Sequence, residues 1–179
     1  MKNLRVVSGS KKGGKIKIPK SSHIRPTIDR VKEAIFSALQ FKIQEKSFLD
    51  LFSGSGQMGI EALSRGASSA VFIDNSFESI KIIKKNISDF EFEDKSKVFL
   101  SDAIEFLETT NFNFDIAFLD PPYGSENLSL ILSSLAKKMK PGGIFVCENS
   151  RNTVVPENVR NFSLKKRYHY GDILVTMYN

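Results

Sequence analysis

The sequence predicts an α/β domain in which a mostly parallel sheet is covered by helices on both faces. From residue 48 onward, short apolar segments typical of strands alternate with segments typical of helices. This repeated order predicts parallel pairing, because parallel neighbours need a crossover between them. Two strand-like segments at the C-terminus are too close for such a crossover, so they predict an antiparallel hairpin that completes the sheet.

Two elements are predicted before the first strand of that sheet. Residues 4–7 and 15–18 flank a glycine-containing turn, a pattern that predicts a basic β-hairpin. A helix is expected to follow Pro26, with Thr27 as its N-cap. Apolar residues recur in this helix at a spacing that makes one face, which has to pack on the sheet. They are Val31, Ala34, Ile35, Ala38 and Leu39.

Strands and helices are predicted in alternation after that helix. The strands are expected at residues 48–52, 70–74, 97–100, 114–119 and 144–148, with helices at about 57–65, 76–88, 103–109 and 126–139. Pro141-Gly142-Gly143 ends the last helix, because neither residue type sustains a helical backbone. The terminal hairpin, residues 161–167 and 172–178, brings the sheet to seven strands.

One domain is expected, because 179 residues with 41% hydrophobic content can bury one sizeable core. We expect a monomer in which residues 1–24 form a basic arm on a domain of residues 25–179. There is neither a run of ~18 to 20 apolar residues nor a signal peptide, so a cytoplasmic location without membrane contact is expected. Cys147 lies in an apolar run, and His23 and His169 are far apart, so no metal site is expected.

The positive charge is concentrated near the N-terminus. The chain carries a net charge of +6, and residues 1–46 hold 12 Lys and Arg against 3 Asp and Glu. Clustered basic side chains are typical of phosphate binding in nucleic-acid partners, although a solvated surface has the same composition. The candidate nucleic-acid-binding residues are Arg5, Lys11, Lys12, Lys15, Arg25 and Thr27.

A glycine-rich turn follows the first strand of the sheet, where open α/β sheets bind ligands. Gly54, Gly56 and Gly59 fit the G-x-G-x-x-G pattern, which by itself does not distinguish a dinucleotide from S-adenosylmethionine. Asp50 favours S-adenosylmethionine, because its carboxylate would repel a pyrophosphate and attract the ammonium of a methionine moiety. The cofactor-binding residues expected in this segment are Asp50, Phe52, Ser53, Gly54 and Gly56.

Two further carboxylates follow the next two strands. Asp74 has two oxygens that match the vicinal hydroxyls of a ribose, although a role at the start of a helix would also explain it. Asp102 could bind the adenine amine, cap the following helix in a capping box with Glu105, or do both. Asn75 and Ala103, which come directly after the two carboxylates, are expected beside the cofactor.

The segment Asp120-Pro121-Pro122-Tyr123 follows a buried strand at the same edge of the sheet. A base amine is a poor nucleophile because its lone pair is conjugated with the ring. Hydrogen bonds to the Asp120 carboxylate and the Pro121 carbonyl would localise that lone pair. The two prolines stiffen the turn, and Tyr123 offers a face on which an extruded base can stack. The four residues are therefore the predicted catalytic group for methylation of an amine on a nucleic-acid base.

Together these segments resemble the bacterial small-subunit ribosomal RNA guanine-N2 methyltransferase family, the RsmD type, over essentially the whole chain. The matching segments are residues 25–27, 30–36, 49–56, 59–67 and 118–123. The resemblance implies a Rossmann-like class I methyltransferase fold, S-adenosylmethionine as cofactor, and N2 methylation of one guanine in 16S rRNA within small-subunit assembly particles. Asp74 and Ser53 stand where the family favours glutamate and alanine, and both departures keep the expected chemistry.

Three other functions fit parts of the pattern. A DNA adenine-N6 methyltransferase would use the same amine chemistry, but it needs an element that reads DNA, for which only the arm and the tail are available. A non-enzymatic RNA-binding assembly factor would explain the arm and leave the carboxylates without a reason. An NAD-dependent dehydrogenase would share only the glycine-rich turn and the carboxylate that follows it.

Overall fold

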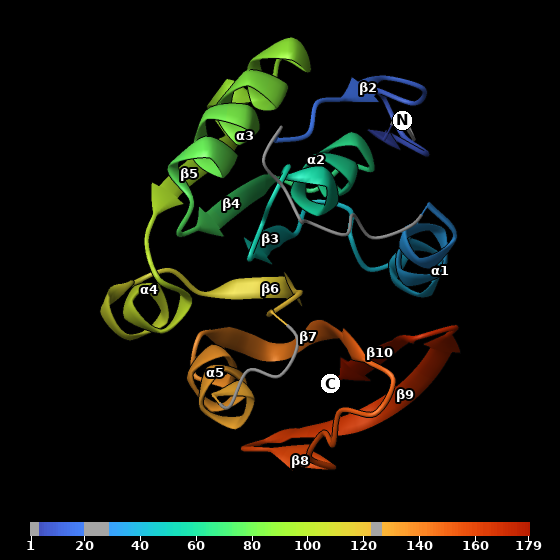
Figure 1. Cartoon of the computed structure of the whole chain (residues 1–179), viewed down its shortest axis with the longest axis vertical. Coiled ribbons are helices and arrows are strands. Elements are labelled where there is room, and N and C mark those ends of the chain that lie inside the picture. The colour runs from blue at the N-terminus through green and yellow to red at the C-terminus, as the bar shows by residue number, and fades with distance from the viewer. Residues whose placement is uncertain (1–3, 20–28, 123–126) are drawn as a thin grey trace.

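A sheet forms the centre of the structure, a computed structural model that describes residues 4–19, 29–122 and 127–179 (Figure 1). Within these residues, the strands of the sheet are β3 (Ser47–Leu51), β4 (Ser69–Asp74), β5 (Ser96–Leu100), β6 (Phe114–Leu119), β7 (Met139–Ser150), β8 (Asn158–Val159), β9 (Phe162–Tyr170) and β10 (Ile173–Tyr178). Their order across the sheet is β5-β4-β3-β6-β7-β10-β9-β8. The first five strands in this order are parallel, and the last three are added in antiparallel pairs.

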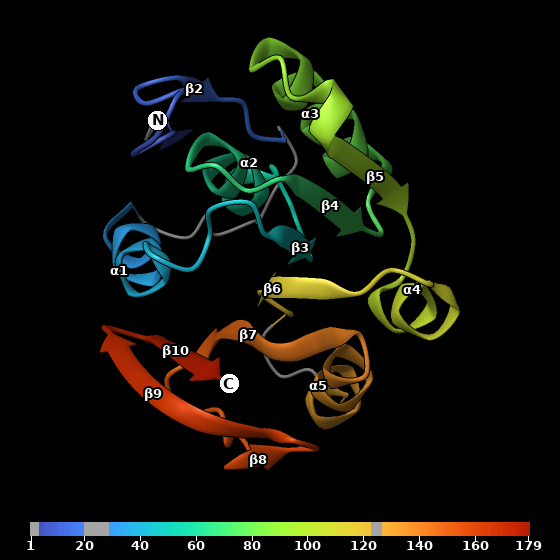
Figure 2. The same cartoon turned by 180° about the vertical axis from the view of Figure 1, so that it is seen from behind.

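Helices cover both faces of this sheet. They are α1 (Asp29–Leu39), α2 (Gln57–Ser64), α3 (Phe77–Asp89), the short 3-10 helix η1 (Glu93–Lys95), α4 (Ala103–Thr109) and α5 (Leu128–Ala136). The first three pack on one face, and α4 and α5 pack on the other (Figures 1 and 2). A hairpin of β1 (Leu4–Arg5) and β2 (Lys15–Ile16) lies beside α2 and α3. Of the described helices, none is long and apolar enough to cross a membrane.

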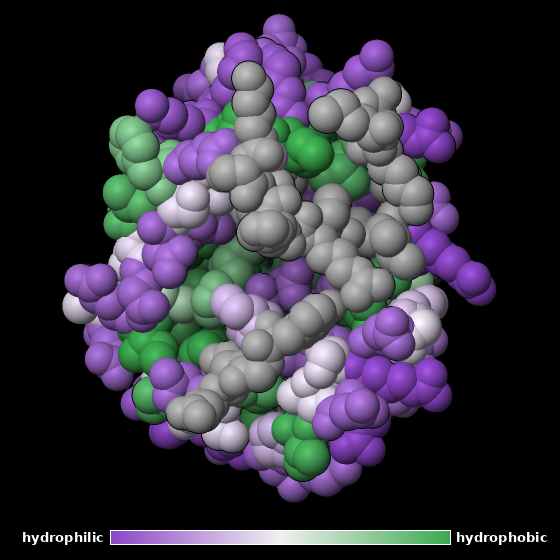
Figure 3. Space-filling model, viewed as in Figure 1, coloured by the Kyte–Doolittle hydropathy of each residue, from purple (hydrophilic) through white to green (hydrophobic). Residues whose placement is uncertain are grey.

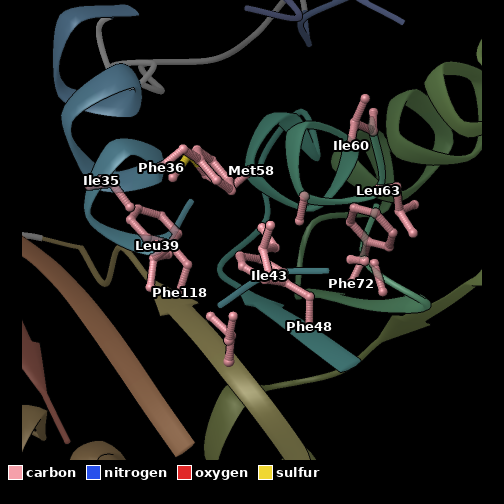
Figure 4. Close-up of a cluster of buried hydrophobic side chains, with 14 of the residues drawn as sticks. Ile35, Phe36, Leu39, Ile43, Phe48, Met58, Ile60, Leu63, Phe72 and Phe118 are labelled. Atoms are coloured by element: carbon pink, nitrogen blue, oxygen red, sulfur yellow. The ribbon is translucent and has the colours of Figure 1, made fainter. Parts of the chain in front are cut away.

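Two layers of core arise from the alternation of side chains along each strand. Phe48 and Phe118 point toward α1 and α2, and Phe48 stacks on Phe36 with ring centroids 6.3 Å apart (Figure 4). Their neighbours Leu49 and Leu119 point to the other face and pack with α4 and α5. Successive residues of a strand face opposite sides, so a strand covered on both faces needs apolar residues throughout. This requirement produces the continuous apolar segments of the sequence.

The predicted Rossmann-like α/β class is confirmed, and most predicted elements begin and end within two residues of the observed bounds. The region after α5 differs. The sequence predicted helix up to Met139 and a break at residues 141–143, whereas β7 starts at Met139 and runs through that segment. Met139 pairs with Phe114, and the register then shifts while Gly142 adopts a φ of 72°. A bulge therefore lets the strand accommodate residues that usually end one.

The C-terminal hairpin extends further than predicted. β9 continues to Tyr170, and the turn at Gly171, with a φ of 59°, leads directly into β10. The two-residue strand β8 pairs with the start of β9, so the described sheet has eight strands where seven were expected. A pair this short leaves almost no pattern in the sequence. Thr27, the predicted N-cap of the first helix, lies outside the described residues.

A buried glutamate on α2 holds the N-terminal hairpin. Glu61 Oε2 accepts a hydrogen bond from Val7 N at 2.7 Å, and Oε1 accepts one from Ser8 N at 3.0 Å. The same carboxylate lies 2.7 Å from Arg65 Nε and 3.8 Å from Lys32 Nζ. The hairpin also adds apolar side chains to the core shared with α1, α2 and α3, namely Leu4, Val6 and Ile16. The hairpin is therefore packed into the same core as the helices.

We expect Glu61→Ala to lower the free energy of unfolding by about 3 kcal/mol, because it leaves buried cations and backbone amides without their shared acceptor. Urea denaturation followed by circular dichroism measures the loss. The control is Glu157→Ala, since Glu157 pairs with Arg167 on the surface, where both side chains are largely exposed. That variant should lose no more than about 1 kcal/mol. Equal losses in the two variants would contradict the anchoring role of Glu61.

Candidate active site

Three residues of the turn between β3 and α2 have a left-handed backbone conformation. Phe52, Gly54 and Gly56 have φ angles of 64°, 54° and 76°. Glycine adopts such angles freely, whereas a phenylalanine there is strained, and strained turns gather at ligand sites. Ser53 Oγ donates to the Asp50 carbonyl at 2.5 Å and accepts a hydrogen bond from the β4 backbone at 2.9 Å. The hydroxyl of Ser53 therefore joins the ends of β3 and β4 beneath the turn.

Asp50, on β3, is buried beside this turn. Its Oδ2 accepts a hydrogen bond from Gly59 N in the first turn of α2, at 2.9 Å. Burial raises the pKa of Asp50 to about 8; the bond from Gly59 opposes the shift, and the Asp74 carboxylate adds to it. Among the described residues, no Lys or Arg side chain lies within ion-pair distance of Asp50. A buried carboxylate in this state favours a ligand that supplies positive charge.

Asp74, at the end of β4, is half-buried and faces the same turn. Its Oδ2 accepts a hydrogen bond from Gly54 N at 2.8 Å, and its Oδ1 accepts one from Ser76 N at 2.9 Å. The N-cap of α3 is Ser76, whose hydroxyl accepts from Ser79 N, so Asp74 does not itself cap the helix. Each carboxylate oxygen can accept a second hydrogen bond. Asp74 is therefore held in a fixed orientation and can still bind a diol.

Asp102, which follows β5, caps α4. Its Oδ1 accepts hydrogen bonds from Ile104 N at 2.8 Å and from Glu105 N at 3.2 Å. The capping alternative is therefore confirmed, while a role at the adenine stays a prediction. Of the two neighbours expected at the cofactor, Asn75 is exposed beyond the end of β4, and Ala103 is buried as the first residue of α4.

Asp120 lies just past the end of β6, within electrostatic range of Asp50 and Glu148. Burial raises the pKa of Asp120, and the carboxylates of Glu148 and Asp50 raise it further. Glu148 belongs to the neighbouring strand β7 and is buried as well. Adjacent parallel strands thus bring several carboxylates to one edge of the sheet. Such a cluster of perturbed acids is typical of a functional site and favours a cationic ligand.

The two prolines after Asp120 differ in burial: Pro121 is buried and Pro122 is exposed. Tyr123, the fourth predicted catalytic residue, lies outside the described residues.

Cys147 on β7 is a buried apolar side chain, as expected, and burial raises the pKa of its thiol. In the part of the chain that the structure describes, no three His, Cys, Asp or Glu side chains are grouped as a metal ion would require.

The tip of the N-terminal hairpin lies away from this edge. The hairpin turn packs against the C-terminal end of α2, where Lys11 N donates to Ser64 Oγ at 3.0 Å. The 8 residues of α2, a length of about 12 Å, separate that contact from the glycine-rich turn. Lys11 Nζ pairs with Glu91 at 2.5 Å. The exposed arm residues without an ion pair to any described residue are Arg5, Lys12 and Lys15. Arg25 and Thr27 lie outside the described residues.

Hydrophilic residues gather around much of the rim of the face drawn in Figure 3, and hydrophobic residues reach its surface in smaller patches.

Three buried polar residues near the site or the hairpin were not predicted from the sequence, namely Glu61, Asn86 and Glu148. A signal existed for Asn86, because it falls on the buried stripe of α3 together with Ile83 and Ile87. A polar residue within an apolar stripe usually has a specific partner.

Stability should fall with rising pH because of Asp50. Its pKa rises from an ordinary value of 3.8 to about 8 on folding, so between these values the folded state holds a proton that the unfolded state has lost. Relative to Asp50→Asn, the wild type should lose about 4 kcal/mol between pH 5 and pH 9. Urea unfolding at both pH values measures this loss.

The control for that measurement is Asp115→Asn, at the opposite end of β6 from Asp120. Burial raises the pKa of Asp115, but hydrogen bonds from Lys140 and Ser47 outweigh it and hold the pKa at about 2. Asp115 therefore does not titrate in the tested window, and its variant should differ from wild type equally at both pH values. Parallel pH curves for wild type and Asp50→Asn would show that Asp50 is ionised throughout.

Sequence comparisons agree with this geometry. The family model described as "Conserved hypothetical protein 95" matches residues 4–179. YlbH of Bacillus subtilis strain 168, provisionally named an rRNA methyltransferase, is 36% identical over 180 residues that cover 98% of each chain. Ribosomal RNA small subunit methyltransferase D of Haemophilus influenzae is 32% identical over 162 residues, which cover 87% of this chain and 84% of that protein.

A solved structure of a similar protein has the same fold. YhhF from Escherichia coli, provisionally described as a methyltransferase, superimposes with a TM-score of 0.89 at 29% identity, covering 98% of this chain and 97% of that one. The family model and both curated relatives span most of the chain, so the resemblance predicted from the sequence is confirmed. The chain belongs to the family described as conserved hypothetical protein 95, the RsmD family.

Proposed function

We propose that this protein transfers a methyl group from S-adenosylmethionine to the N2 amine of a guanine in 16S rRNA. The main support for this proposal is the position of Asp120. This hydrogen-bond acceptor has a raised pKa and lies on the same edge of the sheet as the buried Asp50 and the glycine-rich turn. Ribosomal RNA as the substrate class rests on family membership, since the Haemophilus relative is named for the small-subunit RNA. The choice of guanine N2 rests on the amine chemistry of the D-P-P-Y segment and on the family resemblance.

The residues around the turn fit S-adenosylmethionine. Asp50 is a buried carboxylate without a described cationic partner, which suits the α-ammonium of the methionine moiety. Asp74 is fixed by the amides of Gly54 and Ser76 and keeps free lone pairs for two ribose hydroxyls. Asp102 caps α4 with Oδ1, and its other carboxylate oxygen is available to the adenine amine. When bound, the cofactor supplies an electrophilic methyl group, so no enzyme-bound nucleophile is needed.

Asp120 and Pro121 would act on the attacking amine. An ionised Asp120 carboxylate and the Pro121 carbonyl would accept the two N–H hydrogens, which localises the lone pair and aims it along the transfer axis. The raised pKa of Asp120 makes it a stronger base than an exposed carboxylate, so it can also take the proton that the amine releases. The fixed φ of Pro121 and Pro122 limits motion of these acceptors. Tyr123 remains the predicted stacking face for the flipped base.

Tritiated methyl transfer to small ribosomal subunits from cells that lack this protein tests the proposal. Nuclease mapping of the labelled RNA should give N2-methylguanine at one position. We expect Asp120→Ala to lower the transfer rate at least about 100-fold, while S-adenosylhomocysteine affinity stays within a few-fold, because Asp120 contacts the amine. Label in adenine of DNA would replace this proposal with the adenine-N6 activity, and RNA binding without label would replace it with a non-enzymatic role.

The matched control is Asp115→Ala. Asp115 belongs to the same strand as Asp120 but lies at its other end, where it accepts hydrogen bonds from Ser47 N and Lys140 Nζ at 2.9 Å and 2.8 Å. Its loss should lower stability and leave methyl transfer near the wild-type rate at a temperature at which the variant is folded. Substantial transfer by Asp120→Ala would rule out the proposed mechanism.

A second prediction concerns RNA binding by the arm. Lys12 and Lys15 are exposed and make no ion pair with a described residue, so both are available to phosphates. Replacing both with alanine should flatten the slope of log K against log salt by about 1 to 2, since each phosphate contact releases counterions. The defect in transfer should appear mainly in KM and shrink at low salt. Filter binding at several salt concentrations measures the slope.

The control for the arm is the double variant Lys95→Ala/Lys137→Ala. Lys95 in η1 and Lys137 at the end of α5 are also exposed, so the pair removes the same charge from other surfaces. If general charge alone attracts RNA, the two double variants will bind with the same salt slope. In that case the arm has no specific role in the proposed function.

A further inference from the structure

A single buried amide on α3 joins the arm to the glycine-rich turn. Asn86 is fully buried, and each polar atom of its side chain is bonded. Oδ1 accepts one hydrogen bond and Nδ2 donates two, so both donor hydrogens of the Asn86 amide are used. The orientation of the amide follows from its partners, because the acceptor must face an N–H group and the donors must face carbonyls.

On the side of the arm, Asn86 pairs with both backbone groups of Lys17. Lys17 N donates to Asn86 Oδ1 at 2.9 Å, and Asn86 Nδ2 donates to Lys17 O at 2.8 Å. Lys17 is the first residue after β2, so this two-point contact fixes the place where the chain leaves the hairpin. The side chain of Lys17 also pairs with Asp89 on α3. The exit of the arm therefore follows α3 closely.

On the side of the site, the same Nδ2 donates to Ser55 O at 2.9 Å. The peptide unit between Ser55 and Gly56 is held from both ends, because Gly56 N donates to Ser53 O at 2.7 Å. Gly56 is the left-handed residue at the start of α2, with a φ of 76°. Rotation of this peptide would change the shape of the turn, so Asn86 helps to set the backbone that the cofactor is expected to approach.

The two contacts share one planar group. The two hydrogens of Asn86 Nδ2 lie in the plane of the amide, so a shift of the arm strains or breaks the bond to the turn, and a shift of the turn affects the arm in the same way. Asn86 thus hydrogen-bonds both Lys17, at the exit of the hairpin, and Ser55, within the glycine-rich turn. The arm and the turn are therefore mechanically linked, although the hairpin tip packs about the length of α2 away from the site.

We infer that Asn86 is a positioning residue that makes RNA binding at the arm and cofactor binding at the turn cooperative. The inference rests on the proposed function, since it takes RNA as the ligand of the arm and S-adenosylmethionine as the ligand of the turn. RNA that immobilises the arm removes one source of motion from the Ser55–Gly56 peptide, so the cofactor meets a turn that is already ordered. Cooperativity between binding sites is reciprocal, so the cofactor must tighten RNA binding by the same factor.

The experiment measures the dissociation constant of tritiated S-adenosylhomocysteine by equilibrium dialysis, with and without saturating small ribosomal subunits from cells that lack this protein. In the wild type we expect the subunits to tighten binding at least about fivefold, the lower end of common coupling factors. Asn86→Ala should bind each ligand alone, more weakly than wild type, with a coupling factor near one. A residue that merely stabilises the fold would weaken both affinities and leave the factor unchanged.

Ser64→Ala is the matched control. Ser64 also bonds the arm at two points, accepting from Lys11 N at 3.0 Å and donating to Ser8 O at 2.6 Å. Unlike the amide of Asn86, its hydroxyl is not hydrogen-bonded to the glycine-rich turn. It should weaken RNA binding and keep the wild-type coupling factor. A factor of one in wild type, or a wild-type factor in Asn86→Ala, overturns the inference. Failure of the proposed function looks different, because wild type would then bind no S-adenosylhomocysteine or transfer no methyl group.

Hydrogen exchange on the wild type provides a test that needs no variant, in case Asn86→Ala does not fold. Without cofactor, subunit binding should slow amide exchange in the turn at residues 53–59, and S-adenosylhomocysteine alone should slow exchange at Lys17. Protection that stays within the arm on RNA binding, and within the turn on cofactor binding, overturns the inference.

Discussion

The hydrogen bond from the Gly59 amide to the buried Asp50 carboxylate fixes the junction of β3 and α2, and the rest of the site depends on that junction. It holds the first turn of α2 against the end of β3, so the residues between them take up a tight left-handed turn. Residue 59 must be glycine, because a Cβ there would lie 2.2 Å from the Phe72 ring. The direction that α2 then takes carries Glu61 and Ser64 to the hairpin. One junction therefore positions both the proposed cofactor site and the arm.

Charge is divided between two regions of the molecule. Carboxylates from adjacent strands meet at the carboxyl edge of the sheet, where burial and mutual repulsion raise the pKa values of Asp50 and Asp120. The exposed cations of the hairpin lie beside the C-terminal half of α2. A sulfonium donor and a polyanionic acceptor need opposite potentials, and a separation by the length of one short helix lets a single small domain provide both.

Features with a local or periodic cause could be predicted from the sequence. Strands buried on both faces leave continuous apolar segments, and glycines and carboxylates at strand ends mark the ligand edge, so the fold class and the turn at Gly54 and Gly56 could be predicted. The roles of Glu61 and Asn86 could not, because their partners are backbone groups 54 and 69 residues away. The course of β7 through residues 141–143 was also missed, since Met139 and Ile144 on either side of this segment pair with β6 and a bulge between them accommodates the proline and the glycines.

The position of β10 affects how the chain reaches this structure. Among the described strands, β10 is made last, yet it lies in the interior of the sheet between β7 and β9. During synthesis the parallel half can assemble first, while the long apolar strand β7 presents an open edge until residues 173–178 leave the ribosome. An unpaired edge of this kind readily pairs with other chains. The nascent protein is thus most prone to aggregation in the interval just before its last strand closes that edge.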